Sequence, residues 1–171
     1  MPQLDEKTLE IVARHLQEQA EARANSSEGD LFGRSAFNRY YYATYLEVRY
    51  GLGKLQDEWS GDMPHATIPQ VLRGQVVKAL KNGYSLANKN NDREAMSLCS
   101  DGITAAKNLA ELMEKGRGIR VAADYHPEIT VDFKSHVDFK LNTVEVSDAR
   151  SWPARARGFV SAITQAWRQV I

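Results

Sequence analysis

Apolar residues recur at helical spacing over most of the chain, with charged and amide side chains between them. The clearest case is residues 4–24, which contain no Gly or Pro and place Leu4, Ile11, Val12 and Leu16 near one helix face. The same pattern predicts further helices, which cover residues 31–52, 68–73, 76–87, 93–122 and a last segment that runs to Trp167.

Polar and conformationally special residues mark the ends of these helices. The expected N-caps are short side chains whose oxygen accepts a bond from the first free backbone N–H groups, namely Asp30, Asp92 and either Ser147 or Ser151. Gly51 and Gly53 are suitable stop residues for the second helix. Pro127 limits the long fourth segment, because a helix interior does not accept proline.

Between Ile129 and Leu141 the period changes from helical to a strict alternation of apolar and polar residues. We therefore expect two short strands, which form a β-hairpin inserted near residues 129–146. The insertion either pairs its edge with a strand of a partner or covers the helices with Phe133 and Phe139, and we favour the second interpretation. Together the elements predict an all-α fold. It is a single domain over residues 1–171, built as an up-and-down bundle of about five helices with this hairpin.

The composition is that of an ordinary globular domain, with 171 residues, 43% of them hydrophobic and 26% charged. The single cysteine, Cys99, cannot form an internal disulfide, and the N-terminal residues lack the basic start and apolar segment of a secretory signal. No apolar run approaches the roughly 18 residues of a membrane span. We therefore expect a cytoplasmic protein without a membrane segment.

The formal net charge is zero, from 22 Lys and Arg against 22 Asp and Glu, but the charges are distributed unevenly. Residues 1–30 carry three bases and seven acids, whereas residues 71–89 carry four bases and no acid. A local basic surface is compatible with this balance, so RNA remains a candidate partner. Three arginines near Trp152 in the last helix either contact RNA by charge and stacking or form a solvated face, and we favour the solvated face.

The second predicted helix contains three consecutive tyrosines at 40–42. At 100° per residue they sweep about 200° of the helix, so they cannot all face one core. We expect Phe37, Tyr41 and Thr44 to face inward and Tyr42 to be half-exposed. Tyr42 then either lines a pocket or interface or is an ordinary surface aromatic.

The densest group of functional side chains lies where the long helix is expected to end, and it consists of Arg117, Arg120, Asp124, Tyr125 and His126. Arginine is suited to gripping phosphate, and the histidine proton moves near neutral pH. Together they suffice for RNA cleavage without a metal, in which histidine takes the proton of the ribose hydroxyl and arginine neutralises charge on the phosphate. The alternative is that the arginines only complement the helix dipole and that His126 is a turn residue.

The standard nucleotide-binding and zinc motifs are missing from the sequence: it has no Walker A loop, no Gly-x-Gly-x-x-Gly after a strand and no His-Glu-x-x-His. None of the histidines, at positions 15, 65, 126 and 136, lies three or four residues from another histidine or from the cysteine. The sequence therefore predicts neither a metal site nor a cofactor.

Three segments follow one another in a recognisable order. Residues 34–43 combine Ser and Arg with Tyr-Tyr-Ala, Pro64-His65 precedes an apolar stretch, and residues 120–125 read Arg-x-x-Ala-Asp-Tyr. Over about residues 30–170 this order and spacing resemble the HEPN family of nucleotide- and RNA-associated helical domains. The resemblance implies a bundle of four or five helices that forms a two-fold homodimer.

The resemblance also implies an activity. In many HEPN members Arg-x4–6-His motifs from two protomers meet and cut RNA without a metal, and the chain carries such a motif as Arg120-x5-His126. The implied catalytic residues are therefore Arg120 and His126, and the implied substrate-binding or supporting residues are Arg117, Asp124, Tyr125, Arg39, Tyr42 and His65. Such nucleases act as toxins or phage-defence effectors, with a small nucleotidyltransferase antitoxin or another defence protein as partner. The alternatives are a non-catalytic HEPN module that binds a nucleotide or a protein, and a bundle that acts only through oligomerisation.

The spacing of the motif restricts how its two residues meet. Six steps along a regular helix place His126 about 240° round from Arg120. His126 therefore joins Arg120 of the same chain only if the helix ends near Ala123 and the chain turns back before Pro127. Otherwise His126 meets the arginine of a second copy.

Overall fold

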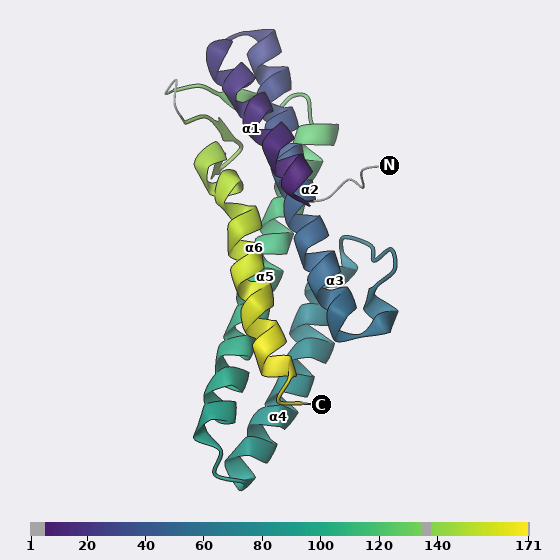
Figure 1. Ribbon diagram of the computed structural model, residues 1–171. Helices are drawn as coiled ribbons and strands as arrows, with labels where there is room; N and C mark the ends of the chain where they lie inside the picture. The colour runs from purple at the N-terminus through teal and green to yellow at the C-terminus, as the bar shows by residue number, and fades with distance from the viewer. Residues whose placement is uncertain (1–5, 135–137, 171) are drawn as a thin grey trace. The chain divides into compact units, whose positions relative to one another are not determined.

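The structure is a computed structural model that describes residues 6–134 and 138–170. Helices dominate it, and a small sheet precedes the last helix (Figure 1). The helices are α1 (Glu6–Ala22), α2 (Ser27–Leu55), α3 (Thr67–Val71), α4 (Val77–Lys89), α5 (Arg93–Tyr125) and α6 (Val146–Trp167). A π-helical turn at Leu72–Val76 joins α3 to α4 without a break, and a 3-10 turn at Asp57–Trp59 follows α2. The predicted class, an all-α bundle of about five helices with a short β insertion, is confirmed.

The chain divides into two compact units. The first contains the described residues up to Leu46 together with Lys115–Ala154, and the second contains Glu47–Glu114 together with the described residues from Arg155 onward. Helices α2, α5 and α6 each contribute residues to both units. The candidate chemistry at the end of α5 therefore belongs to the first unit.

Helix α1 confirms the first predicted helix, but its buried face differs from the predicted one. The buried residues are Leu9, Ala13, Gln17 and Ala20, whereas Ile11 is 70% exposed. Tyr40 of α2 explains this choice, because its hydroxyl donates to Oε1 of Gln17 at 2.6 Å inside the unit. Gln17 must therefore face α2, and Ile11 and Val12 turn outward. Leu4 lies outside the described residues.

The predicted end signals of α2, Asp30, Gly51 and Gly53, are all wrong. The helix begins at Ser27, and the Ser26 hydroxyl caps it by accepting the Gly29 N–H at 3.0 Å, so Asp30 lies inside the first turn. The helix also runs through both Gly51 and Gly53 to Leu55, so neither glycine ends it. A Cβ on Gly51 would lie 2.4 Å from a methyl carbon of Val160, so this glycine serves close packing rather than helix termination.

The remaining helix ends are partly as predicted. Asp92 caps α5 by accepting the Ala95 N–H at 3.0 Å, as expected. Neither predicted serine caps α6; instead the Asp138 carboxylate accepts the Ser147 N–H and hydroxyl at 3.4 and 3.1 Å. Helix α5 continues to Tyr125, three residues beyond the predicted end and two before Pro127.

The insertion forms a three-stranded antiparallel sheet of β1 (Val131–Asp132), β2 (Lys140–Leu141) and β3 (Val144–Glu145). Strand β2 pairs with both neighbours, and Asn142 adopts a positive φ of 56° in the tight turn to β3. The predicted alternation over 129–141 therefore holds in part, with one more strand than expected. His136 and Val137 lie outside the described residues.

The sheet covers the first unit with its aromatic side chains. The Phe37 and Phe139 rings meet edge to face at 5.9 Å between centroids, and Phe133 packs on Phe139 at 5.2 Å. Phe139 is fully buried. The preferred interpretation, in which Phe133 and Phe139 cover the helices, is confirmed.

The core of the first unit also explains the tyrosine pattern. Tyr40 and Tyr41 are buried, as are Phe37 and Thr44, while Tyr42 is half-exposed as predicted. Burial raises the pKa of Tyr40 to about 12 and raises that of Tyr41 further. Both phenols therefore stay neutral at physiological pH and act as packing residues.

The second unit packs around Trp59 and Trp167, whose rings meet edge to face at 5.7 Å between centroids. Its ion pairs include Arg157 with the nearly buried Glu47, at 2.8 Å. Cys99 is buried, and this burial raises the pKa of its thiol. Of the predicted site residues, His65 alone belongs to this unit.

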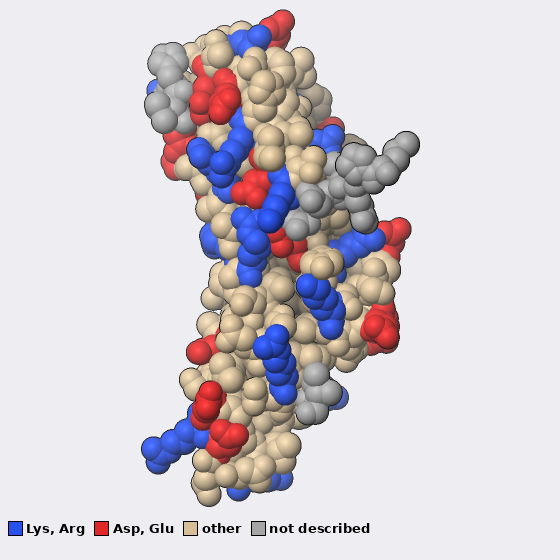
Figure 2. Space-filling model, in the orientation of Figure 1, with Lys and Arg blue, Asp and Glu red and all other residues tan. Residues whose placement is uncertain are grey.

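Charged side chains of both signs are interspersed over the face seen in Figure 2, with neutral residues between them. No helix within the described ranges is long and apolar enough to cross a membrane.

Candidate functional site at the end of helix α5

Arg120 and Asp124 form an ion pair one turn apart on α5, with Nε and Oδ2 3.3 Å apart. The two groups are close enough for an ion pair but are not aligned for a hydrogen bond. The buried Nε of Arg120 therefore has no hydrogen-bond partner among residues 6–134 and 138–170. The guanidinium carbon lies 5.5 Å from the centroid of the Tyr42 ring. Tyr42 thus contributes a cation–π contact to the site rather than being an isolated surface aromatic.

Asn38 completes this group from α2. Its amide donates to both carboxylate oxygens of Asp124, at 2.8 and 3.0 Å. Asn38 and Tyr42 stand one turn apart on α2, as Asp124 and Arg120 do on α5. We call these four residues the Arg120 cluster. Sequence reasoning missed Asn38, although its position one turn before Tyr42 was the available signal.

In the Arg120 cluster, the Nε edge of the guanidinium faces Asp124, and the edge with the two terminal nitrogens does not. The Arg120 side chain is 18% exposed, and within the described part of the chain its two terminal nitrogens make no hydrogen bond or ion pair. An arginine oriented through Nε presents its terminal nitrogens as a fork that matches phosphate or carboxylate oxygens. Terminal nitrogens left in this way can chemically bind an anion such as a phosphate or a carboxylate.

His126 follows directly after α5 and has a separate partner. Its Nδ1 lies 2.8 Å from Oε1 of Glu128, and the two side chains are 48% and 67% exposed. The pKa of the Glu128 carboxyl is lowered first by its own backbone N–H and then by the hydrogen bond with His126. Nε2 of His126 makes no hydrogen bond within the described residues. Sequence reasoning missed Glu128, for which the signal was a carboxylate two residues after the histidine.

The turn that carries His126 is fastened to α2 on both sides. Arg34 donates to the carbonyl oxygens of Ala123 and Ile129, at 2.8 and 2.6 Å. Asp30 pairs with Arg34 at 3.0 Å and accepts the Val131 N–H at 2.6 Å. We call Asp30 and Arg34 the α2 clamp. Sequence analysis considered Asp30 only as a cap and did not assign Arg34 a role, because their partners lie about 90 to 100 residues away in the sequence.

The structure does not bring Arg120 and His126 together in one chain. The His126 N–H still bonds to the Ala122 carbonyl at 3.2 Å, so the helical path continues to this residue. The chain therefore does not turn back near Ala123. Such a turn was the condition for a contact between His126 and Arg120 of the same chain. No hydrogen bond or ion pair joins the two side chains where the structure describes them.

The other predicted site residues are placed as follows. Arg117 and Arg39 are exposed, and Tyr125 is 66% exposed. His65 is half-buried and belongs to the second unit, whereas all the others belong to the first. Trp152 is fully buried, so it does not offer a ring on which an RNA base stacks.

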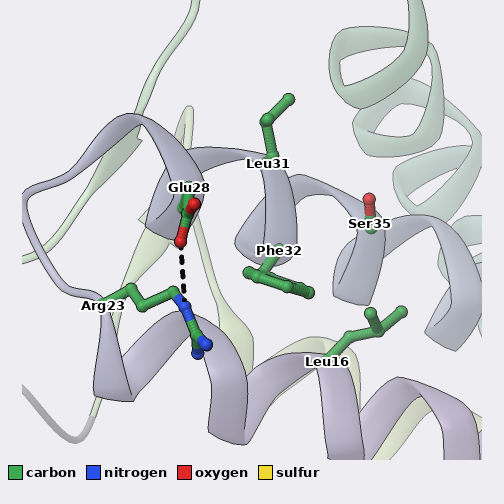
Figure 3. Close-up of a pocket in the computed structure, with 6 residues that line it drawn as sticks. All are labelled: Leu16, Arg23, Glu28, Leu31, Phe32 and Ser35. Carbon is green, nitrogen blue, oxygen red and sulfur yellow. Dashed lines mark hydrogen bonds and ion pairs between the residues drawn. The ribbon is translucent and has the colours of Figure 1, made fainter.

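A groove of about 450 Å³ lies between α1 and α2, away from these residues in the sequence (Figure 3). Leu16, Leu31 and Phe32 supply its apolar surface. Two other lining residues, Arg23 and Glu28, form an ion pair with an N–O distance of 3.1 Å. None of its lining residues is a predicted site residue, so the groove is a separate feature.

No group of three or more His, Cys, Asp or Glu side chains in the described ranges is placed to hold a metal ion. Comparisons with protein-family models, with curated proteins and with solved structures find no match for this chain.

Proposed function

We propose that this chain is a HEPN-type endoribonuclease that cuts RNA without a metal and acts as a homodimer. The observation that carries the proposal is the His126–Glu128 pair, in which a carboxylate holds Nδ1 and leaves Nε2 uncommitted. This arrangement orients an imidazole for general base catalysis. Arg120, held through Nε by Asp124, supplies the phosphate-binding group.

The reaction uses the 2′-hydroxyl of the RNA as nucleophile. Nε2 of His126 takes the hydroxyl proton as the 2′-oxygen bonds to phosphorus, and the bond from phosphorus to the 5′-oxygen breaks. The leaving oxygen takes a proton from water or from a second imidazolium, and the products are a 2′,3′-cyclic phosphate and a 5′-hydroxyl. Arg120 neutralises charge that develops on the phosphate oxygens.

A second copy is part of the proposal because Arg120 and His126 point around α5 in different directions. In a two-fold dimer Arg120 of one protomer faces His126 of the other, which forms two equivalent sites. His126 and Arg117 are exposed and so accessible to a partner. The protein then works in the cytoplasm, with a nucleotidyltransferase antitoxin or another defence protein as its natural partner.

The test is cleavage of total tRNA and of a mixed single-stranded RNA by the purified protein in EDTA. We expect the wild type to cut and both His126→Ala and Arg120→Ala to lose at least about 100-fold in rate. The matched controls are His15→Ala and Arg93→Ala, which replace exposed residues of the same types elsewhere. The proposal fails if the wild type cuts neither RNA, or if folded H126A cuts as fast as the wild type.

A second candidate function is a non-catalytic HEPN module that binds a nucleotide. The Arg120 cluster favours it, because this cluster presents an uncommitted guanidinium edge without help from His126. A nucleotide that binds only the native state stabilises it by RT ln(1 + [L]/Kd), so the melting temperature rises with the logarithm of the nucleotide concentration once that concentration exceeds Kd. This candidate predicts such a rise in the wild type and H126A, and none in R120A.

A further inference from the structure

We infer that Glu128 is the positioning residue of His126, which fixes the tautomer and the direction of the imidazole. The inference rests on the proposed function, since it names a residue that prepares the base of that reaction. Its structural part, the tautomer of His126, is measurable without any RNA.

The first step concerns the proton between the two side chains. The Nδ1 of His126 and the Oε1 of Glu128 are 2.8 Å apart, a hydrogen-bond distance. An ionised carboxylate has no proton to donate, so Nδ1 must carry the proton of this bond. A neutral imidazole has a single N–H, and Nε2 is therefore left with its lone pair.

The second step concerns the backbone that holds the pair. The Ile129 N–H bonds to the His126 carbonyl at 3.0 Å, which closes a turn around Pro127 and Glu128. Proline fixes its own φ, and the α2 clamp holds the Ile129 carbonyl through Arg34. An exposed pair on a free loop contributes little, but here the turn sets the two side chains face to face before any substrate arrives.

The third step concerns the effect of the imidazole orientation on proton transfer. With Nδ1 engaged by Glu128, the ring cannot offer Nδ1 to the substrate, and Nε2 is the nitrogen left to accept a proton. A base in the wrong tautomer cannot accept a proton at the required atom. Glu128 does not touch the reacting atoms itself, so its removal lowers the rate without abolishing it.

The test is the tautomer of His126 in the full-length protein, from long-range ¹H–¹⁵N correlation spectra recorded well above the ordinary histidine pKa of about 6.5. The H126A spectrum identifies the His126 signals among the four histidines. We expect mainly the Nδ1–H form in the wild type and in Glu145→Ala, which removes another exposed glutamate of the first unit. In Glu128→Ala we expect the Nε2–H form, which an unconstrained neutral histidine favours.

Cleavage assays on the same proteins give the second readout. E128A should cut about 10-fold more slowly than the wild type, while E145A cuts at the wild-type rate. A wild-type His126 that is mainly Nε2–H overturns the inference, and this measurement needs only folded H126A, which assigns the signals. An unchanged tautomer in folded E128A also overturns it. A wild type with the expected tautomer that cuts no RNA overturns the proposed function instead and leaves the Glu128–His126 assignment standing.

Discussion

The Asn38 amide binds both oxygens of the Asp124 carboxylate, and this contact links α2 to the last turns of α5. The Asp124 carboxylate therefore has two partners, Arg120 on its own helix and Asn38 on α2. Replacing Asn38 by aspartate would put two carboxylates at hydrogen-bond distance.

We therefore expect Asn38→Asp to lower the free energy of unfolding by about 2 kcal/mol at pH 7, against about 1 kcal/mol for Asn38→Ala, which only removes the hydrogen bonds. Urea denaturation measures both values. Asn108→Asp, at an exposed position of α5, controls for the added charge. The excess cost of N38D over N38A should shrink at pH 3, where carboxylates protonate. Equal stabilities of N38D and N38A at pH 7 would contradict this account of the cluster.

The α2 clamp predicts that a change at Arg34, which has no proposed catalytic role, strongly lowers the free energy of unfolding. Arg34 is 11% exposed and bonds two carbonyls and a carboxylate at once, which the single ammonium of lysine does not reproduce. We expect Arg34→Lys to lower the free energy of unfolding by about 2–4 kcal/mol. The comparison is Arg39→Lys on the exposed side of the same helix, with a change within about 0.5 kcal/mol. An R34K protein as stable as R39K would show that the clamp does not hold the turn.

Tyr40 predicts how stability depends on alkaline pH. Burial raises its pKa from 10.0 to about 12, so the folded state keeps a proton that the unfolded chain releases. The resulting stabilisation is complete below pH 10 and is lost as the pH rises towards 12. Tyr40→Phe removes the contribution of Tyr40 to this dependence, leaves that of the buried Tyr41, and also removes the bond to the buried Gln17.

The expected result for Y40F is a loss of about 1–2 kcal/mol at pH 7 together with a shallower decline above pH 10. Urea denaturation from pH 7 to pH 11 measures both effects. Tyr125→Phe is the control, because its ring is 66% exposed. A decline in Y40F as steep as in the wild type would show that Tyr40 does not carry the dependence.

The shared site of the proposed dimer predicts that two inactive variants complement each other. A mixed dimer of R120A and H126A has one site with both functional residues and one with neither. Equal mixing makes about half of the dimers mixed, so cleavage should return to about a quarter of the wild-type rate. H126A alone should sediment as the wild type does, because a single exposed polar side chain does not anchor an interface. Mixing without recovery, from variants shown to exchange subunits, would exclude a site shared in this way.

The fold was largely accessible from the sequence because its signals are local. Helical periodicity located the helices, and the alternation between Ile129 and Leu141 located the insertion. The predictions were wrong where a residue from another segment, rather than a sequence neighbour, capped a helix or explained a glycine. Asp138 caps α6 in place of a serine, and Val160 explains a glycine that resembled a stop signal.

The candidate site was accessible only in part for the same reason. The pattern identified Arg120, Asp124 and Tyr42, since they lie in dense or unusual segments. Asn38 and Arg34 are common residue types on a helix, and what distinguishes them is contact with residues 86 to 95 positions later. The spacing of the Arg-x5-His motif did predict that its two residues would not meet unless the helix ended early.

During synthesis, the two residues of the α2 clamp appear long before the groups that they bind. Asp30 and Arg34 leave the ribosome about 90 to 100 residues before the carbonyls and the N–H that they bind. Domains fold as their residues emerge, from the N-terminus onward. A nascent chain that ends before Ala123 therefore has α2 without any of its clamp partners, and the His126 turn takes its final geometry only when translation has passed Val131.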